Sequence, residues 1–256
     1  MPQPRGGSST LRPTPPTSQL REAKAAGYVR LPGHLHTAAA VPPVDESALR
    51  DFVRRLTHSG DTLEHYLRDL LSQGLSADHL YLQLFAPAAR RLGAMWEEDR
   101  CTFVDVTLGV GRLQQLTHGF GDLLRGPVES VATGRVLVAG APREQHTLGV
   151  TMVAEFLRRD GWEVVLAPAS DDSRDLISEA ELDWFDVVAI SAATDHSVGR
   201  LKQVIRELRR RGRNRGLKVI VGGRVFSECP ELTHQVGADG SAPDARAAAT
   251  IALTML

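Results

Sequence analysis

The sequence contains only two cysteines, Cys101 and Cys229, which stand far apart and form no CxxC motif. This pattern indicates neither a disulfide framework nor a structural zinc site, and it fits a reducing compartment. The chain also lacks an uninterrupted apolar stretch of the roughly 18 residues that a membrane-spanning helix needs, and its N-terminus has no basic-then-apolar export signal. We therefore expect a cytoplasmic protein.

The chain has almost no excess charge of either sign, with a formal net charge of -1 at pH 7. A balanced charge provides no general attraction to nucleic acid or to an anionic membrane. The 256 residues, 42% of them hydrophobic, are enough for one or two globular domains with a buried core. We expect any effect on DNA to be indirect, through a partner protein.

The first 45 residues are poor in apolar side chains and rich in proline. They hold eight of the fourteen prolines, together with a run of glycine, serine and threonine. A segment of this composition cannot bury enough apolar surface to offset the entropy of ordering the chain. Residues 1–45 are therefore predicted to be a disordered, proline-rich arm.

Residues 46–125 carry apolar side chains at helical spacing, in four stretches separated by turn or capping residues. Short connections between amphipathic helices are typical of an antiparallel four-helix bundle, and residues 126–134 are predicted to be a linker. The predicted helices begin after Asp45, run over residues 61–73, extend from Ser76 to Trp96, and extend from Thr102 to Phe120.

After the linker, the pattern changes to short apolar runs that alternate with amphipathic stretches. This alternation predicts a parallel sheet with right-handed crossovers. Five strands in about 120 residues favour a flavodoxin-like, Rossmann-like domain over residues 135–256 with strand order 2-1-3-4-5. The predicted strands are 136–139, 163–166, 187–190, 219–221 and 237–240, and the predicted helices are 147–160, 173–181, 198–211, 230–236 and 243–256.

The loop after the first predicted strand, Gly140 to His146, lacks the motifs of common nucleotide sites. It is neither GxGxxG nor a GK[ST] phosphate loop, which makes nucleotide binding by those devices improbable. The third strand ends in Ile190-Ser191 rather than in an aspartate, so phosphoryl-acceptor chemistry is also disfavoured.

Small and polar residues gather instead where three of the predicted strands end. Glu144 can accept a hydrogen bond from one nitrogen of His146, which fixes the imidazole tautomer and raises the basicity of the other nitrogen. A single histidine cannot build a protein metal site, but it can be the axial ligand of a metal held in a macrocycle, either a corrin or a heme. The residues are Glu144 and His146 after the first strand, Ser191 after the third, and Gly222 and Gly223 after the fourth.

The segment from Glu144 to Gly149 resembles the D-x-H-x-x-G signature of cobalamin-binding domains, with Ser191 and the pair Gly222-Gly223 at the expected strands. The resemblance implies that His146 replaces the dimethylbenzimidazole of cobalamin as the lower ligand of cobalt and that Glu144 supports it. It also implies that the displaced nucleotide tail enters the sheet beside the serine and the glycines. Glycines suit this role because a backbone without Cβ permits close approach.

The resemblance covers residues 47–256, because cobalamin modules of this type carry a preceding four-helix cap. Leu92 to Trp96 looks like the end of the third helix of that cap, where the tryptophan contacts the upper side of the cofactor. With an N-terminal arm and no helix-turn-helix, the chain resembles the AerR/PpaA antirepressors of photosynthetic bacteria. That resemblance implies a light- or redox-responsive transcriptional regulator that binds hydroxo- or adenosylcobalamin and acts through a repressor of the CrtJ/PpsR type.

The chain departs from the family pattern in three places. Glu144 replaces the usual aspartate, so its carboxylate lies one methylene further out and its bond to His146 is expected to differ. Ser191-Ala192-Ala193 lacks the leucine of the usual S-x-L, which predicts a wider or differently packed tail pocket. Val106-Thr107 stands where light-sensing cobalamin regulators carry a Glu-His pair, so the upper face is expected to be apolar or open to another ligand.

Two other interpretations stay open. A corrinoid carrier of a methyltransferase system would use His146 in the same way, and a heme-binding version of the sensor also fits one axial histidine. The sequence shows no thiol nucleophile with a partner base and no paired carboxylates, so an independent enzyme is not expected. The run from Arg206 to Arg215 is interpreted as the solvated end of a surface helix, and His118 is expected to be exposed.

Overall fold

The computed structural model describes residues 44–58, 62–125 and 132–256, which all fall in one compact unit. The predicted arm lies outside the described residues except for positions 44 and 45, and so does most of the predicted linker, residues 126–131. The disorder of the arm and the proposed domain boundaries therefore stay predictions. None of the helices in the described ranges is long and apolar enough to cross a membrane.

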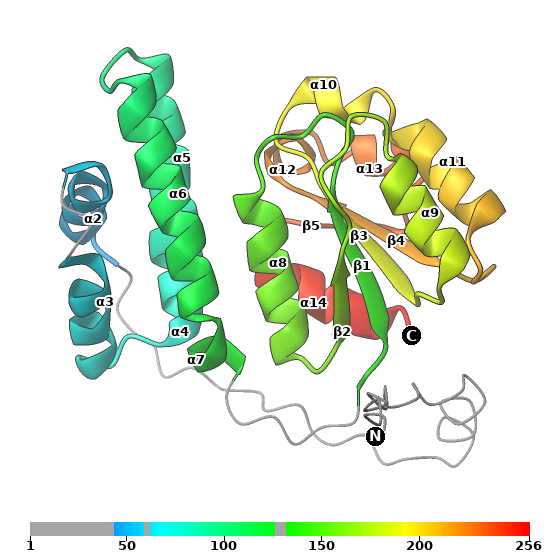
Figure 1. Cartoon of the computed structure of the whole chain (residues 1–256), viewed down its shortest axis with the longest axis horizontal. Helices are drawn as coiled ribbons and strands as arrows, with labels where there is room; N and C mark the ends of the chain where they lie inside the picture. The colour runs from blue at the N-terminus through cyan, green and yellow to red at the C-terminus, as the bar shows by residue number, and fades with distance from the viewer. Residues whose placement is uncertain (1–43, 59–61, 126–131) are drawn as a thin grey trace, which may run out of the picture. The chain divides into compact units, whose positions relative to one another are not determined.

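The region before the sheet is helical, as predicted (Figure 1). Thr102 begins α6 with a capping box, in which its hydroxyl accepts from the Asp105 N–H at 3.2 Å and the Asp105 carboxylate accepts from the Thr102 N–H at 2.9 Å. Ser76 caps the preceding helical segment through the His79 N–H. The helices are α2 (Glu46–His58), α3 (Leu63–Ser72), α4 (Ala77–His79), η2 (Leu80–Phe85), α5 (Ala86–Glu97), α6 (Phe103–Gly119) and α7 (Gly121–Arg125).

The third predicted helix differs from expectation, because its middle part is a π-helix, η2, rather than a regular α-helix. The Ala86 N–H donates to the Tyr81 carbonyl, five residues back. Pro87 follows in the first turn of α5, and it has no N–H with which to continue the regular pattern. The wider turn leaves Tyr81 and Phe85 fully buried.

The sheet has five parallel strands in the predicted order, β2-β1-β3-β4-β5, so the flavodoxin-like fold class is confirmed. Alternate residues of the strands face two separate apolar cores, one under α8 and α14 and the other under α9 and α11 (Figure 1). The strands are β1 (Arg135–Gly140), β2 (Glu163–Leu166), β3 (Val187–Ser191), β4 (Lys218–Gly222) and β5 (Gly240–Ala242). The helices of this part are α8 (Leu148–Arg159), α9 (Arg174–Leu182), α10 (Asp195–Val198), α11 (Leu201–Arg211), α12 (Arg224–Glu228), α13 (Leu232–Val236) and α14 (Ala245–Thr254).

The predicted position of the fifth strand is wrong. Residues 237–240 were expected to form it, but Gly237 ends α13 in the left-handed conformation, with φ of 81°. Asp239 instead accepts a hydrogen bond from the Val219 N–H at 2.7 Å, and the strand pairing begins at Gly240. The apolar pattern is too short here to locate a three-residue strand without its pairing partner. The structure also adds α12, which the sequence did not predict.

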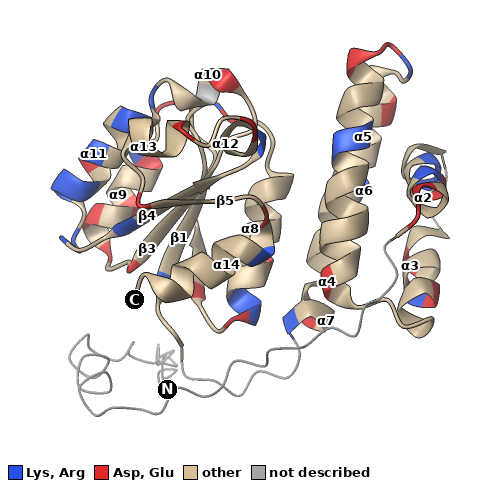
Figure 2. Cartoon of the chain, turned by 180° about the vertical axis from the view of Figure 1, so that it is seen from behind, with Lys and Arg blue, Asp and Glu red and all other residues tan. Residues whose placement is uncertain are grey.

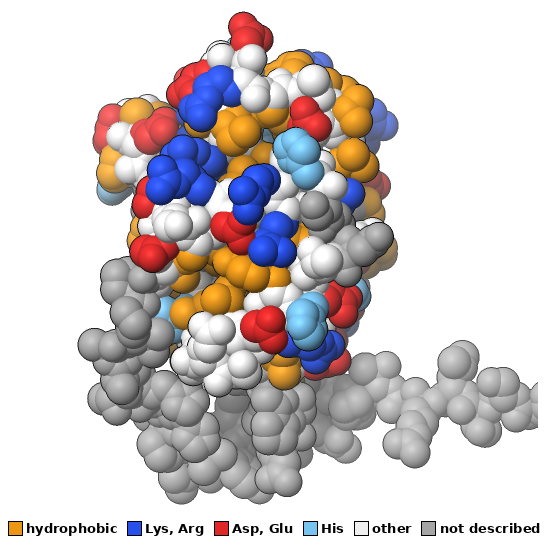
Figure 3. All heavy atoms as spheres, turned by 90° about the vertical axis from the view of Figure 1, so that its left-hand side faces the viewer, with side chains coloured by type: hydrophobic (Ala, Val, Ile, Leu, Met, Phe, Trp, Pro, Cys, Tyr) orange, Lys and Arg blue, Asp and Glu red, His pale blue; other side chains and the backbone are white. Residues whose placement is uncertain are grey.

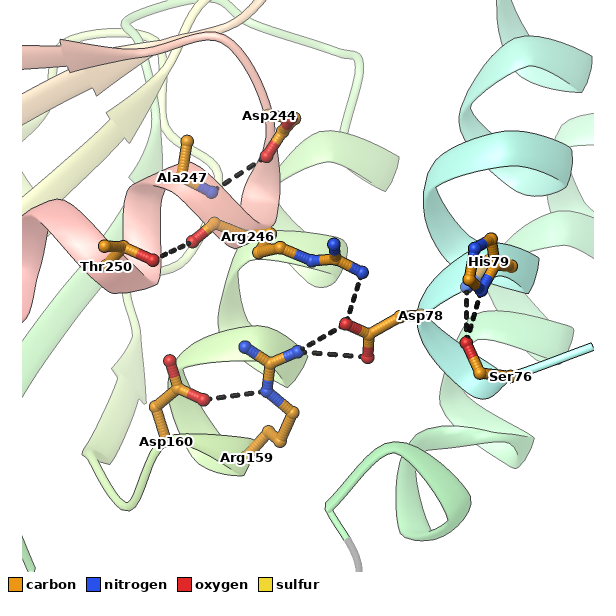
Figure 4. Close-up of polar contacts among 9 residues, drawn as sticks. All are labelled: Ser76, Asp78, His79, Arg159, Asp160, Asp244, Arg246, Ala247 and Thr250. Carbon is orange, nitrogen blue, oxygen red and sulfur yellow. Dashed lines mark hydrogen bonds and ion pairs between the residues drawn. The ribbon is translucent and has the colours of Figure 1, made fainter. Parts of the chain in front are cut away.

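An ionic contact joins the helical region to the sheet domain (Figure 4). The Asp78 carboxylate receives the Arg159 guanidinium of α8 at 2.9 Å, and it also pairs with Arg246 of α14. Arg159 is held in turn by Asp160 at 2.7 Å. One carboxylate in α4 therefore connects both helices that cover this face of the sheet.

A second junction is centred on Glu155 of α8, whose side chain is only 1% exposed. Its carboxylate pairs with Arg125 of α7 and, at 2.8 Å, with Arg158. Nearby, the Tyr81 ring contacts the Phe156 ring edge-on, with centroids 5.9 Å apart. Buried charge needs such partners, because an unpaired carboxylate in the interior is strongly destabilising.

Three arginines of the predicted basic run, Arg209, Arg210 and Arg211 at the end of α11, form ion pairs. Arg211 binds Glu181 at 2.7 Å and Arg209 binds Asp239 at 3.0 Å, and the basic positions of α11 are visible in Figure 2. Figure 3 shows another face, where hydrophobic, basic and acidic side chains are interspersed. These pairs agree with the interpretation of the run as the solvated end of a surface helix.

We predict that Glu155→Gln destabilises the chain by about 1–3 kcal/mol, because the amide keeps the shape but removes the buried charge that pairs with Arg125 and Arg158, of which Arg125 retains only the exposed Asp122 as an acidic partner. Urea unfolding followed by circular dichroism would measure the change. Glu163→Gln is the matched control, since Glu163 is half-exposed and its pair with Arg135 is a surface ion pair worth roughly 0–1 kcal/mol. Equal effects of the two substitutions would contradict the prediction.

Candidate functional site

The candidate site lies at the carboxyl ends of β1, β3 and β4. Strand register aligns Gly140 with Ser191 and Ser191 with Gly222, so the loops that follow these strands leave the sheet side by side. In parallel sheets, ligands bind at this edge where the strand order reverses, and here the reversal falls between β1 and β3.

The loop after β1 is attached to β3 by its backbone. The Ala141 N–H donates to the Ser191 carbonyl at 2.8 Å, and the Glu144 N–H closes a turn on the Ala141 carbonyl at 2.9 Å. Arg143, between them, takes a positive φ of 63°, which is uncommon for a residue with a Cβ. This tight turn directs the Glu144 side chain back into the protein.

Glu144 and His146 form the hydrogen-bonded pair that the sequence predicted. One carboxylate oxygen of Glu144 lies 2.5 Å from His146 Nδ1 and also accepts the His146 backbone N–H at 3.0 Å. Because an ionised carboxylate only accepts, Nδ1 is the donor in this contact, and in the neutral imidazole the lone pair then lies on Nε2. The Glu144 side chain is 2% exposed and the His146 side chain is 67% exposed, so the ring projects from a buried anchor.

The added methylene of glutamate is accommodated by a third partner. The second carboxylate oxygen of Glu144 accepts the backbone N–H of Ala193 at 2.7 Å, just beyond β3. Burial raises the pKa of the Glu144 carboxyl, but hydrogen bonds from the Ala193 and His146 backbones and from the His146 ring lower it further. The pKa therefore lies below its ordinary value of 4.5, and Glu144 is ionised at neutral pH.

A pocket of about 140 Å³ opens beside this loop and contains four of the predicted cofactor residues: Gly149, Ser191, Gly222 and Gly223. Its other walls are mainly small or apolar side chains from β1, β3, β4, β5, α8 and α14, and three residues of the helical region complete it. The remaining lining residues are Leu82, Ala86, Arg90, Val138, Met152, Val153, Ala189, Ile190, Ile220, Val221, Ala242, Pro243, Asp244, Ala245 and Ala248.

Glycine is required at two of these positions by the protein's own backbone. A Cβ at Gly223 would lie 2.3 Å from the Ala192 carbonyl oxygen, and the residue has φ of 99°. A Cβ at Gly222 would lie 2.9 Å from the Ala242 carbonyl oxygen. The sequence predicted glycine here because a ligand tail would come close to the backbone. The structure adds that the carbonyl oxygens of Ala192 and Ala242 also come close to these glycines, which the sequence did not predict.

Trp96, like Glu144 and His146, is a predicted site residue that does not line this pocket. Its side chain is 47% exposed at the end of α5, and its ring lies edge-on to Phe103, with centroids 6.0 Å apart. Three residues that follow Phe103 in α6 are also exposed, namely Val104, Thr107 and Leu108. These side chains make the exposed surface of this part of α6 partly apolar, and its role at an upper face of a cofactor stays a prediction.

Two contacts at the site had no signal in the sequence. Gln114 of α6 donates to the Thr147 hydroxyl at 2.6 Å, which links the helical region to the residue after His146. The Ala193 N–H donates a hydrogen bond to the second carboxylate oxygen of Glu144. Both depend on elements that are distant along the chain, so no local motif reports them.

The donor set fits a metal already held in a macrocycle. Within the described residues, no group of three or more histidine, cysteine, aspartate or glutamate side chains is arranged to hold a metal ion. His146 instead presents one free ring nitrogen, oriented by a buried carboxylate, next to a pocket of small residues. A single axial donor suits a metal held in a macrocycle, and the pocket beside it suits a side group of that macrocycle.

Comparisons with known proteins agree with this geometry. Residues 134–250 match the B12-binding domain. Over 179 residues, the chain is 34% identical to the "Uncharacterized 20.5 kDa protein in bchF-crtJ intergenic region" of Rhodobacter capsulatus. The aligned region covers 67% of this chain and 91% of that protein. The monomethylamine corrinoid protein of Methanosarcina barkeri shares the fold, with a TM-score of 0.69 at 18% identity over 81% of this chain and 96% of that one.

We predict that Glu144→Gln lowers the free energy of unfolding of the ligand-free chain by about 1–3 kcal/mol at neutral pH. Since the folded-state pKa lies below the unfolded value, the carboxylate stabilises the fold above pH 4.5, and this contribution is lost as the pH falls through the folded-state pKa. The difference between wild type and variant should therefore shrink in acid.

Denaturant unfolding at a series of pH values would test this. Glu97→Gln serves as the control, because Glu97 is exposed at the end of α5. A gap between wild type and Glu144→Gln that stays constant from neutral pH to well below 4.5 would show that the carboxylate charge is not what stabilises the loop.

Proposed function

The chain belongs to the B12-binding family, as a relative of the Rhodobacter capsulatus protein, and on that premise we propose that it binds cobalamin with His146 as the lower axial ligand of cobalt. The observation that carries this proposal is the 2.5 Å contact between His146 Nδ1 and the buried Glu144 carboxylate. It leaves Nε2 as a donor held in one orientation.

The residues around His146 have separate tasks in this proposal. Glu144 keeps the proton on Nδ1 and increases the electron donation of Nε2. Ser191 and Gly149 border the pocket that would receive the displaced nucleotide tail, with Gly222 and Gly223 on its other side. Bound cobalamin supplies a cobalt whose upper ligand can be exchanged chemically or released by light.

Cobalamin is favoured over heme by the pocket next to the histidine. Heme has no nucleotide tail, so a heme site would not need the small-residue lining around Gly149 and Gly222. The exposed apolar pair Trp96 and Phe103 offers a hydrophobic surface to the upper side of a bound corrin. Hydroxo- and adenosylcobalamin are both candidates for the bound form.

We further propose a regulatory role. The relative's name places it between bchF and crtJ, and a repressor of the CrtJ/PpsR type is the partner that the AerR/PpaA resemblance implies. The charge of the chain offers no strong drive toward DNA, which favours action through that partner. A change at the upper face would act on α5, which carries Trp96 near its end, and on α6, which carries the Gln114 contact to Thr147. Such a shift would expose or hide a partner surface.

A corrinoid carrier in a methyltransferase system is the second candidate. The fold it shares with the Methanosarcina barkeri protein supports this reading, and the His146 site would serve a carrier equally well. The carrier would need the helical region to move aside for a partner enzyme, and the junctions at Asp78 and Glu155 would oppose that movement.

We predict that His146→Ala weakens cobalamin binding at least tenfold or abolishes it, because the axial donor is lost. Absorbance titration of the full chain with hydroxo- and adenosylcobalamin, in darkness and after illumination, would measure affinity and cobalt coordination. His118→Ala is the control, since His118 is an exposed histidine on α6. An unchanged corrin spectrum and affinity in His146→Ala would rule out its ligand role.

The two functions predict different behaviour of the loaded chain. A regulator should change its affinity for a CrtJ/PpsR-type repressor between dark and illuminated states, measured by co-elution or light scattering. A carrier loaded with methylcobalamin should transfer the methyl group to an acceptor when its cognate methyltransferase is added. Methyl transfer without any effect on repressor binding would overturn the regulatory proposal while leaving cobalamin binding intact.

A further inference from the structure

One cation of the helical region faces the pocket. Leu82, Ala86 and Arg90 are spaced four residues apart along η2 and α5, so they lie on one helical face, and all three line the pocket. Arg90 is exposed, whereas Val138 and Ile220 in the same lining are buried. Arg90 therefore stands at the open end of the pocket, above an apolar interior.

Among the described residues, Arg90 has no hydrogen-bond or ion-pair partner, in contrast to several other arginines of the two regions. Its neighbour Arg91 pairs with Glu46 at 3.1 Å on another side of the helix. The acidic residue of the pocket lining, Asp244, caps α14 by accepting the Ala247 N–H at 2.8 Å. The pocket thus has an uncompensated guanidinium at its entrance.

An unpaired guanidinium at the mouth of a largely apolar pocket favours an anionic ligand group. Arginine offers a planar fork of N–H donors that binds phosphate oxygens in pairs, and such charge-assisted bonds are stronger than neutral ones. The nucleotide tail of cobalamin contains one phosphodiester, which carries a negative charge between the corrin side chain and the ribose. The apolar pocket interior suits the tail's aromatic base, which leaves the phosphodiester nearer the entrance.

We propose that Arg90 binds the phosphodiester of the nucleotide tail and so makes the helical region a selector for cobalamins with a complete tail. The proposal rests on the proposed function, since it requires the tail to enter this pocket. The helical region would then contact the cofactor from the tail side through Arg90, in addition to the contact proposed at Trp96. Corrinoids without the nucleotide would gain nothing from Arg90.

The experiment compares cobalamin with cobinamide, a corrinoid that lacks the whole nucleotide tail. Absorbance titrations of the full chain would be made with Arg90→Ala, Arg90→Lys and the control Arg91→Ala. We expect Arg90→Ala to weaken cobalamin binding roughly tenfold, which corresponds to the loss of one charge-assisted contact. Arg90→Lys should recover part of the affinity, and Arg91→Ala should match wild type.

Two further measurements separate recognition of the nucleotide tail from a general loss of corrinoid affinity. Cobinamide affinity should be the same for wild type and Arg90→Ala, and the spectrum of cobalamin-saturated Arg90→Ala should equal that of wild type, because His146 is untouched. Equal cobalamin affinities of Arg90→Ala and Arg91→Ala would overturn the proposal, and so would an equal loss for cobalamin and cobinamide. Failure of wild type itself to bind cobalamin would instead refute the proposed function.

Discussion

The site depends on one buried carboxylate. Glu144 is almost fully removed from solvent, and a buried charge persists only where hydrogen bonds replace the lost water. Its oxygens accept from the His146 ring, the His146 backbone and the Ala193 backbone, so the loop after β1 is tied to the segment after β3. The orientation of His146 therefore follows from the packing of two strands rather than from the loop alone.

The helical region is joined to this framework by charge as well as by apolar packing. Asp78 receives arginines from α8 and α14, and buried Glu155 receives arginines from α7 and α8. The Gln114 contact to Thr147 lies at the other end of α8, close to His146. Helix α8 therefore begins next to the candidate site and carries Glu155, Arg158 and Arg159, which contribute to the junctions with the helical region.

Much of the fold follows from local pattern. Helical spacing, the cap residue Ser76 and alternating apolar runs predicted both regions and the strand order. The errors fall where the pattern is weakest. A three-residue strand at Gly240 depends on pairing with β4, and the π-helical turn over Leu80–Phe85 interrupts a stretch whose apolar spacing is that of a regular helix. Neither leaves a periodic signal that a sequence could report.

For the site, the sequence by itself determined the chemical types: an acid two residues before a histidine, a glycine three residues after it, and small residues at two other strand ends. Spacing of this kind is a property of the chain and needs no coordinates. Only the tertiary structure decided that the Ala193 N–H donates to the second oxygen of Glu144. It also decided that backbone carbonyls leave no room for a Cβ at Gly222 or Gly223, and that Arg90 lines the same pocket. These contacts join residues many positions apart, and only the packing of strands and helices brings such residues together.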